Sequence, residues 1–566
     1  MYRPLGIIGL TIFAAAACTR ETGLQELSAE FCEAASTTIS EIQGRGPASP
    51  LVSTAATTLG VVNHVGDDGF YMQSIAGDGD PATSEGLFVA LSPEGIAVGD
   101  LLALTGVVTE LGGGRNTVTS LSDITAWRRC ASNFAIDRTP FSLPLTGPQR
   151  ESLEGMGIEI ASQLTVTGNY RQASGELLLS GDGILFQPTE VARPGPDARQ
   201  QDAENQRNSI AARWPPKRAL PTGTDLLSGG GVVGHDGRAL TLLLDEQANL
   251  MDPRLYRISP PGARQLRVVS LNLHNYFNGD GVGGGFPTAR GAETAQEFKN
   301  QRQRLSATIR ELEPHLVAAM ELENDGFDQN SAASDFSRDL QAATDRPWQP
   351  VIPQGLDRIG NDQIAVGLFF DPQVLAPVGE ARILEGPAFD DHSRSPLAQT
   401  FIEQASGERF LVVVNHLKSK GSCPDDGRNS DLRDGQGCWN QARVEAAEAM
   451  VSWARQLADA TADQRLLVLG DLNAYRMEDP ITALIEAGLK DLTAPSGPRP
   501  SFSFVYGGEA GTLDYAMASY TLVPFIASAR VLNINSPWPP GMSLPRDWLR
   551  SSDHDPVVVD LRFSRD

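Results

Sequence analysis

The feature that most constrains the fold is a series of apolar segments in the C-terminal half of the chain that end in polar residues. The segments are LRVVSLNL (266–273), LVAAMELEN (316–324), QIAVGLFF (363–370), FLVVVNHL (410–417) and RLLVLGDLN (465–473). Short apolar runs bounded by turn residues are typical of strands that are buried on both faces. Between them, helical spacing of apolar residues predicts two helices, carried by Phe298, Leu305, Ile309 and Leu312 and by Val444, Ala447, Val451 and Trp453.

This alternation predicts a layered α/β domain with its site at one edge of the sheets. The polar residues that follow the strands would meet there. Taken singly, each is explained as well by a structural role, since GDLN is also good turn chemistry. Taken together, they indicate one site. They are Asn272, Glu321, Asn415, His416, Lys418, Lys420, Asp471, Asn473, Asp514, Asp553 and His554.

The residue types suit the hydrolysis of a phosphodiester. The enzyme must neutralise the anion, activate water and stabilise the leaving oxygen. Glu321 offers a hard carboxylate for Mg²⁺ or Mn²⁺, and Asn272 can add a neutral oxygen ligand. His554 is the candidate general base, because imidazole titrates near neutral pH.

The segments ELENDG, NDQIAVGL, NHLKSKG, GQGCWNQARV and RSSDHDPV resemble those of the endonuclease/exonuclease/phosphatase superfamily. That superfamily includes pancreatic-type DNases, abasic-site nucleases, inositol-polyphosphate phosphatases and bacterial sphingomyelinases. The resemblance covers 264–566 and is closest to secreted bacterial nucleases. It implies the four-layer α/β sandwich of the DNase-like fold and a metal-dependent hydrolase.

The resemblance also implies roles for the acidic and histidine residues of the site. Asp553 would face the metal beside Asn272 and Glu321. Asp514 would be the acidic partner of His554, and it is followed by Tyr515 where many relatives have His.

Other residues would act on the substrate itself. Asp471 would orient the attacking water or interact with the phosphate, and Asn473 would donate hydrogen bonds to phosphate oxygen. His416 would donate to phosphate or assist the leaving group. Four cations are candidate phosphate contacts, although each alone is more often a solvated charge: Lys418, Lys420, Arg290 and Arg304.

Three features near these motifs have weaker interpretations. His274 is either a substrate contact or, more commonly, a structural histidine. The glycine-rich GDGVGGGF segment (279–286) predicts a mobile loop and lacks the Gly-Lys-Ser/Thr of a phosphate-binding Walker loop. Asp280 or Asp325 could help to hold a structural Ca²⁺, although neither forms an EF-hand pattern.

The N-terminal half reads as two β-rich domains. Five short strand-like runs between Thr57 and Trp127 predict a small barrel at 51–135. GVVNHVGDDGFYMQS, GDGDPATSEGLFVA and VGDLLALTGVVTE resemble the OB-fold module at the front of secreted bacterial nucleases. Its aromatic residues are either a stacking surface for single strands or core. Residues 140–260 predict a second barrel-like domain, with Arg193 to Asn208 as a loop or helix.

The first residues indicate export. An apolar run from Leu5 to Ala17 follows Arg3 and ends at Cys18, so 1–18 reads as a signal peptide and 19–50 as a tether. Cys18 would be lipidated, as in bacterial lipoproteins, or the chain would simply be secreted. No internal stretch reaches the roughly 18 apolar residues of a membrane span.

The remaining four cysteines predict disulfides in an exported chain. Cys423 and Cys438 bracket a Gly/Asp-rich loop, which leaves Cys32 for Cys130; four reduced thiols are the alternative. No cysteine pattern suggests zinc.

The formal net charge of −24 argues against a broad DNA-binding surface but not against an enzyme that touches few phosphates. The sequence therefore predicts a bacterial nuclease, secreted or held at the outer surface or in the periplasm, that cleaves DNA, with RNA as an additional candidate substrate. The alternatives are an enzyme of the same chemistry acting on phospholipid headgroups or small phosphoesters, and a degenerate binding protein.

Overall fold

The computed structural model describes residues 29–113, 116–214, 218–236, 239–253, 257–390, 393–460, 464–495 and 501–563. The expected signal segment with Cys18 lies outside them. The described chain divides into two compact units. One runs to Asp137 and includes Glu151–Gly157, and the other comprises Arg138–Arg150 and Ile158 onward. Within the ranges described, no helix is both long and apolar enough to cross a membrane.

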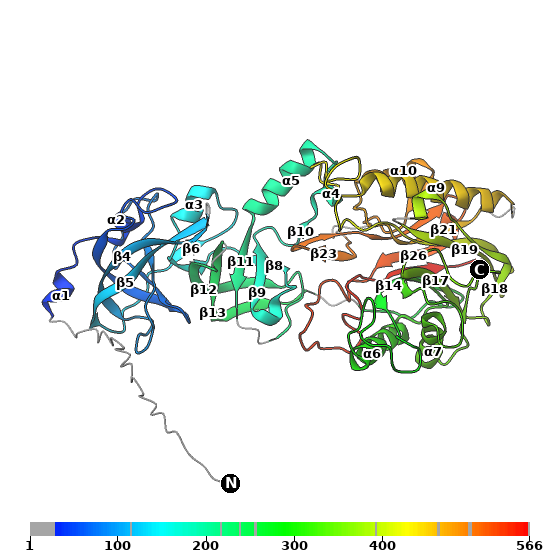
Figure 1. Ribbon diagram of the computed structural model, residues 1–566, viewed down its shortest axis with the longest axis horizontal. Coiled ribbons are helices and arrows are strands. Elements are labelled where there is room, and N and C mark those ends of the chain that lie inside the picture. The colour runs from blue at the N-terminus through cyan, green and yellow to red at the C-terminus, as the bar shows by residue number, and fades with distance from the viewer. Residues whose placement is uncertain are drawn as a thin grey trace, which may run out of the picture. The chain divides into compact units, whose positions relative to one another are not determined.

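The first unit contains a closed five-stranded barrel (Figure 1). Its strand order is β1-β2-β3-β5-β4, in which β3 and β5 are parallel and the other pairs are antiparallel. Cys32 and Cys130 form a disulfide, as expected. The elements are α1 (Glu30–Glu33), α2 (Ile39–Gln43), β1 (Ala55–Val65), β2 (Phe70–Gln73), β3 (Gly86–Val89), β4 (Leu101–Gly113) and β5 (Asn116–Ala131).

Two of the barrel's aromatic residues that were candidates for a stacking surface are buried, and one of them, Phe70, belongs to the apolar core of the barrel. Phe70 is fully buried and Tyr71 is 5% exposed. The Tyr71 ring packs against Phe88 at a centroid distance of 4.9 Å. A base could not stack on Phe70 without opening the barrel, so this side chain acts as core.

Glu154, in the same unit, is a buried carboxylate whose charge is expected to destabilise the fold at alkaline pH. Its Oε1 accepts from the Thr119 amide (2.8 Å) and from Gln43 Nε2 (3.2 Å). Burial raises the pKa of Glu154 to about 8, above its ordinary value of 4.5. A raised carboxyl pKa gives stability that is complete below the unfolded pKa and is lost as pH rises through the folded pKa.

Glu154→Gln should therefore stabilise the protein at pH 8.5 by a few kcal/mol, because it keeps an acceptor and removes the buried charge. At about pH 4 the gain should vanish. Chemical denaturation at the two pH values measures the difference. An equal effect at both would show that the charge is not responsible.

The β-rich segment after the barrel forms a seven-stranded sheet. Its order is β13-β11-β9-β8-β12-β7-β6, and β12 also pairs with β13. The segment Arg193 to Asn208, expected as a loop or helix, contains helix α5. The elements are β6 (Thr139–Phe141), α3 (Gly147–Glu151), β7 (Gly157–Ile160), β8 (Leu164–Gly168), η1 (Gln172–Ser174), β9 (Glu176–Ser180), β10 (Leu185–Phe186), α4 (Pro188–Val191), α5 (Pro196–Arg207), β11 (Ser209–Arg213), β12 (Asp225–His235) and β13 (Leu240–Met251).

The C-terminal part is built on two six-stranded sheets. One has the order β16-β17-β15-β14-β27-β26 and the other β18-β19-β20-β21-β25-β22, while β10 joins β24 and β23 in a small third sheet. The strands are β14 (Leu266–Tyr276), β15 (Leu316–Glu323), β16 (Gln349–Pro350), β17 (Ile364–Phe370), β18 (Leu375–Ile383), β19 (Arg394–Glu403), β20 (Arg409–His416), β21 (Leu466–Asp471), β22 (Leu489–Asp491), β23 (Phe504–Tyr506), β24 (Glu509–Gly511), β25 (Asp514–Ser519), β26 (Ile526–Val531) and β27 (Val557–Leu561).

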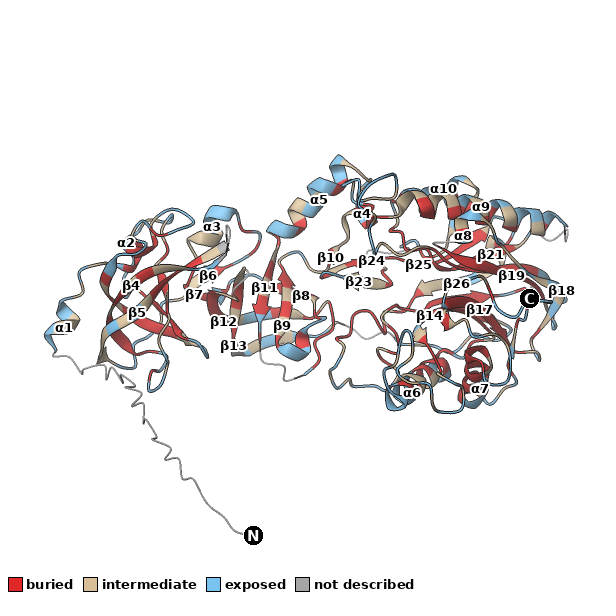
Figure 2. Ribbon diagram, in the orientation of Figure 1, coloured by how far each residue is buried: buried red, intermediate tan, exposed pale blue. Residues whose placement is uncertain are grey.

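The two six-stranded sheets face each other, with helices on their outer faces (Figure 1). A shared core, which includes Val268, Met320, Val412 and Leu469, fills the space between the sheets. The outer faces of α6 and α9 are exposed and their inner faces buried (Figure 2). The helices are α6 (Ala295–Leu312), α7 (Ala332–Thr344), α8 (Pro387–Asp390), α9 (Asn440–Ala460), α10 (Asp479–Glu486) and η2 (Val523–Phe525).

Helix α6 shows how local sequence sets these elements. The Thr294 side chain accepts from the Glu297 amide, and the Glu297 carboxylate accepts from the Thr294 amide, so a capping box begins the helix. The predicted apolar face of α6 is buried. Glu313 takes a left-handed conformation (φ 50°) and Pro314 follows, which ends the helix.

Candidate active site

His554, Asp514 and Asp471 form a buried polar cluster at the ends of β21 and β25. Asp471 and Asp514 are register partners on adjacent antiparallel strands. His554 lies in the loop before β27, and its Nδ1 is 2.7 Å from Asp514 Oδ2 and 3.9 Å from Asp471 Oδ2. One ligand-type atom of each residue lies within 4.8 Å of the others, a spacing that could also hold a metal ion. The 2.7 Å contact, however, has the length of a charge-assisted hydrogen bond.

The two carboxylates favour the charged form of His554. Burial lowers the pKa of His554, but Asp514 and Asp471 outweigh it and raise the pKa well above its usual value. Burial raises the pKa of Asp471 to about 7 against the opposing effect of His554. The two carboxylates would therefore stabilise the imidazolium that forms when His554 accepts a proton, which is the task of the acidic partner in a His–Asp pair.

Neighbouring side chains fix the ring and its loop. The Phe504 ring lies 4.6 Å from the His554 ring, centroid to centroid. Asn535 Nδ2 donates to the His554 carbonyl oxygen (2.7 Å), and Asp555 Oδ1 accepts from the Asn535 amide (2.6 Å). No sequence motif singled out Phe504 or Asn535. Asp555 could have been noticed as the second carboxylate of the DHD segment.

The predicted metal ligands Asn272 and Glu321 lie on adjacent parallel strands. Asn272 pairs with Met320 in the register, so Glu321 is one residue farther along β15. Glu321 has a positive φ of 60°, and its Oε2 accepts from the Asn275 amide at 2.9 Å. Asn272 is buried; its Oδ1 accepts from the His274 amide, and its Nδ2 has no hydrogen-bond partner.

Asp553, the third expected ligand, is half-buried beside His274, with 4.0 Å between Oδ2 and Nε2. Burial raises the pKa of Asp553, but His554, His274 and Arg550 outweigh it and hold the pKa below its usual value. Asp553 is therefore ionised.

These residues fit a hard divalent cation. Their donor atoms are carboxylate and amide oxygens, the ligands that Mg²⁺ and Mn²⁺ prefer. Glu321 acts electrostatically on Asp471, so it belongs to the same cluster of acids. Of the ion pairs found in the described ranges, none includes Glu321. A cation would offset the excess negative charge of this buried cluster.

His416 and Asn473 surround Asp471. His416 is 2% exposed, its Nε2 is 3.6 Å from Asp471 Oδ2, and its Nδ1 has no hydrogen-bond partner. Burial, assisted by Arg394, lowers the pKa of His416 well below its usual value, so the ring is neutral. Asn473 donates through its side-chain Nδ2 to the Leu417 carbonyl oxygen and through its backbone amide to Asp471 Oδ1. Asn415 Nδ2 donates to the Leu469 carbonyl oxygen.

Two of the predicted phosphate contacts lie beside this cluster. Lys418 and Arg290 both act electrostatically on His416. Lys418 Nζ lies 5.1 Å from the centre of the Trp439 ring, and Arg290 is 3.6 Å from Asp362. Arg394 is a third cation here that sequence reasoning missed. It is register partner to His416 and bonds Asp362 Oδ2 at 3.0 Å. The only indication of Arg394 in the sequence was an arginine at the first position of a strand that is otherwise mostly apolar or buried.

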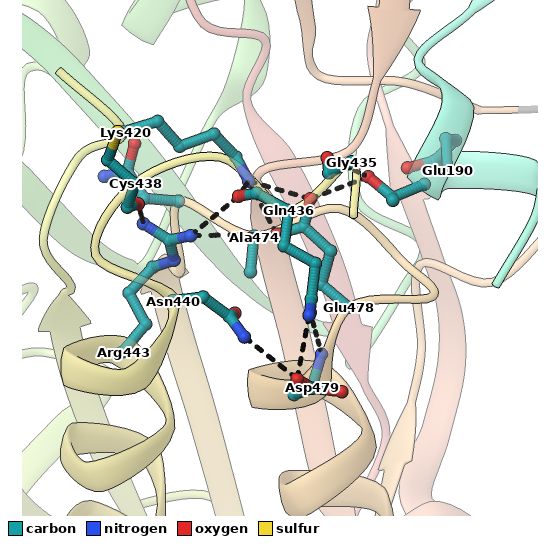
Figure 3. Close-up of polar contacts among 12 residues, drawn as sticks. Glu190, Lys420, Gly435, Gln436, Cys438, Asn440, Arg443, Ala474, Glu478 and Asp479 are labelled. Atoms are coloured by element: carbon teal, nitrogen blue, oxygen red, sulfur yellow. Dashed lines mark hydrogen bonds and ion pairs between the residues drawn. The ribbon is translucent and has the colours of Figure 1, made fainter. Parts of the chain in front are cut away.

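Lys420 has a structural role that differs from the predicted phosphate contact. Its ammonium bonds both carboxylate oxygens of Glu478 (2.7 and 2.6 Å) and the Gln436 carbonyl oxygen (2.6 Å). The buried Arg443 lies in the same network and donates to the Gln436 and Cys438 carbonyl oxygens (Figure 3). Burial lowers the pKa of Lys420 to about 8. Because Glu478 is fully buried, Lys420 is required to neutralise its charge.

Cys438 is disulfide-bonded to Cys423, as expected.

The remaining candidates lie at the edge of the site or outside it. Arg304 is exposed on α6. Tyr515, buried, donates to the Ala474 and Thr512 carbonyl oxygens, which is a packing role. The two Ca²⁺ candidates are occupied by backbone amides: Asp280 accepts from Val282 and Gly284 within its loop, and Asp325 accepts from the Ala332 amide at the start of α7.

Comparison with known proteins relates the chain to one family in sequence and to several solved structures. The sequence profile of the Endonuclease/Exonuclease/phosphatase family matches residues 270–554. Among solved structures, the human Nocturnin catalytic domain with bound sulfate anion shares 17% identity, covering 54% of this chain and 96% of that one, with a TM-score of 0.36. A mannosyl-6-phosphatase of Bacteroides thetaiotaomicron shares 15% identity, covering 53% of this chain and 100% of that one, with a TM-score of 0.36. D. rerio TDP2 complexed with single strand DNA product shares 14% identity, covering 52% of this chain and 98% of that one, with a TM-score of 0.33. No curated protein sequence matches.

Proposed function

The chain belongs to the Endonuclease/Exonuclease/phosphatase family, and from that premise we propose that it is a divalent-metal-dependent nuclease that hydrolyses phosphodiester bonds of DNA. Members of this family are hydrolases, both nucleases and phosphatases, and typically depend on a divalent metal. The observation that carries the proposal is the buried His554–Asp514 hydrogen bond with Asp471 and Glu321 beside it.

Each residue of the cluster has a task in this reaction. His554 takes the proton of the attacking water, and Asp514 holds its ring and stabilises the imidazolium. Asp471 orients the water. The side-chain amide of Asn473 and the neutral ring of His416 contact the phosphate oxygens. Glu321, Asn272 and Asp553 would hold Mg²⁺ or Mn²⁺. When bound, the cation supplies neutralisation of the phosphate and the leaving oxygen.

A basic groove around helix α6 supports a polyanionic substrate. The groove has a volume of about 1290 Å³ and extends to Leu549, next to Arg550. Four exposed cations line it and have no ion pair among the described residues: Lys299, Arg304, Arg310 and Arg546. Two of its three acidic lining residues, Asp335 and Asp339, are neutralised by Arg338 and Arg302. In a chain of net charge −24, this cluster favours a nucleic-acid backbone.

Replacing Lys299 and Arg310 together by Glu should weaken DNA binding. Both lie on one face of α6, about 16 Å apart, so they can contact separate phosphates. The slope of log K against log salt should fall by about 2. Hydrolysis of bis(4-nitrophenyl) phosphate should not change, because this small ester does not reach the groove. Lys490→Glu with Arg455→Glu, both exposed and outside the groove lining, is the matched control. Equal weakening in the control would contradict the contact.

The substrate is tested by a nuclease assay with metal titration on linear and circular DNA, each single- and double-stranded. Parallel assays with RNA, sphingomyelin and a small diester separate the alternative, an enzyme for phospholipid headgroups or small phosphoesters. If no nucleic acid is cut at any metal concentration while the small diester is hydrolysed, the nuclease proposal fails and the alternative stands.

We also propose that the N-terminal barrel is an OB-fold, the C-terminal part is the DNase-like four-layer sandwich, and the protein is exported from a bacterium. The parallel pairing of β3 with β5 in a closed five-stranded barrel supports the first. The two disulfides support an oxidising compartment. Mass spectrometry of the mature N-terminus tests lipidation of Cys18 against simple secretion.

A further inference from the structure

Glu190 is a buried carboxylate that lies outside the family region, 270–554, yet contacts the loop after Asp471 and the loop before Asp514. It belongs to the short helix α4, in the β-rich segment. Its Oε2 accepts from the Thr512 amide at 3.0 Å, and its Oε1 accepts from the Thr512 hydroxyl at 3.1 Å. Arg476 donates to the same carboxylate through Nε (3.1 Å) and its amide (3.3 Å).

On one side, these bonds fix the approach to Asp514. Thr512 is two residues before Asp514, and its carbonyl oxygen accepts from the Tyr515 hydroxyl at 2.9 Å. The Ser503 hydroxyl accepts from the amides of Leu513 and Asp514, both at 2.9 Å. The carboxylate that holds His554 is therefore set by a short segment whose first anchor is Glu190.

On the other side, Glu190 fixes the loop that follows Asp471. Arg476 is in this loop, three residues after Asn473. The Arg476 guanidinium also pairs with Asp491 and donates to the Thr512 hydroxyl at 3.0 Å. A single carboxylate thus connects the loop after β21 to the loop before β25, and both acids that face His554 lie on these strands.

The helix that carries Glu190 is itself attached to the catalytic fold. Strand β10 pairs in parallel with β24, at Leu185 with Glu509 and Phe186 with Ala510. The Thr189 hydroxyl donates to Glu478 at 2.7 Å, within the network that holds Lys420. The Thr189 hydroxyl also lies 3.4 Å from the Gly435 carbonyl oxygen, and Figure 3 shows this network with the neighbouring Glu190. Segment 185–191 is therefore positioned to act as a clamp.

We propose that Glu190 is a positioning residue, supplied by the segment that precedes the family region, which holds Asp514 and Asp471 at the distance that His554 requires. The kinetic test of this inference rests on the proposed function, whereas the contacts of Glu190 can be tested without any turnover. It means that the β-rich segment completes the active site.

The test compares Glu190→Ala, the conservative Glu190→Gln and a matched control, Asn205→Ala. Asn205, on α5, is also buried and joins the same segment to the catalytic fold through Glu509 Oε1 at 2.7 Å, but it touches neither Thr512 nor Arg476. In full-length protein with bis(4-nitrophenyl) phosphate, Glu190→Ala should lower kcat about 10²-fold, the effect of a small misplacement, and leave KM unchanged. Glu190→Gln retains one acceptor oxygen and should restore much of kcat. Asn205→Ala should leave kcat unchanged.

A second readout does not depend on activity. The low-field proton resonance of the His554 Nδ1–H, hydrogen-bonded to Asp514, should be present in the wild type and in Asn205→Ala, and should shift or disappear in Glu190→Ala. An unchanged resonance and kcat in Glu190→Ala would overturn the inference, as would an equal loss in both alanine variants after correction for their folded fractions. If the wild type hydrolyses no phosphodiester but the resonance still responds only to Glu190→Ala, the proposed function fails and the clamp stands.

Discussion

His554→Ala is expected to lower kcat by about 10²- to 10⁴-fold on both DNA and a small diester, the range for the loss of a positioned general base. The ring sits between two carboxylates that stabilise its charged form, and no neighbouring group can replace it. His416, which also lies beside Asp471, is neutral because burial lowers its pKa well below the usual value. Steady-state kinetics on both substrates measure the loss.

The fold of this variant should remain intact. The loop at position 554 is held by its backbone, through the bond from Asn535, so removal of the ring leaves that anchor in place. His274→Ala is the matched control, since His274 is exposed at the edge of the site. It should change kcat far less. Undiminished turnover in His554→Ala, with an unchanged melting temperature, would refute the role assigned to His554.

The sequence predicted which polar residues lie close together when they follow neighbouring strands of one sheet. Asn272 and Glu321 each follow an apolar run, and parallel pairing of β14 with β15 brings such strand ends together. The same logic places Asp471 beside His416 in the register of β20 and β21. Alternation of apolar strands and helices was enough to predict a layered α/β domain, because buried strands and amphipathic helices have distinct periods.

The sequence could not indicate partners from distant segments. Lys420 looked like a free cation in a phosphate-binding motif, but its role is decided by the buried Glu478, which lies 58 residues later. Glu190 is separated from Thr512 by 322 residues and lies in a segment without a recognised motif. Arg394 is explained by Asp362, on the loop before β17. In each case burial and pairing, which depend on the tertiary fold, determine the role of a charge.

Glu321→Gln should abolish tight metal binding and lower kcat by on the order of 10²- to 10³-fold. The substitution keeps the shape and the acceptor for the Asn275 amide but removes the negative charge. Metal ions contribute several kcal/mol to charge stabilisation in such reactions, and each 1.36 kcal/mol is tenfold in rate. Glu321 is also a non-glycine residue with a φ of 60°, a strained conformation that is concentrated at functional sites. Calorimetric titration with Mn²⁺ measures affinity independently of turnover.

The matched control is Glu323→Gln, two residues along the same strand. Glu323 likewise accepts from a backbone amide, that of Asn278 in the loop after β14, at 2.9 Å, and burial raises its pKa to about 7. Its side chain is not among the proposed ligands, so Mn²⁺ affinity and kcat should stay near the wild-type values. If Glu323→Gln lost the metal and Glu321→Gln kept it, the cation would bind on the Asp325 side of β15, and the assignment of Glu321 would be wrong.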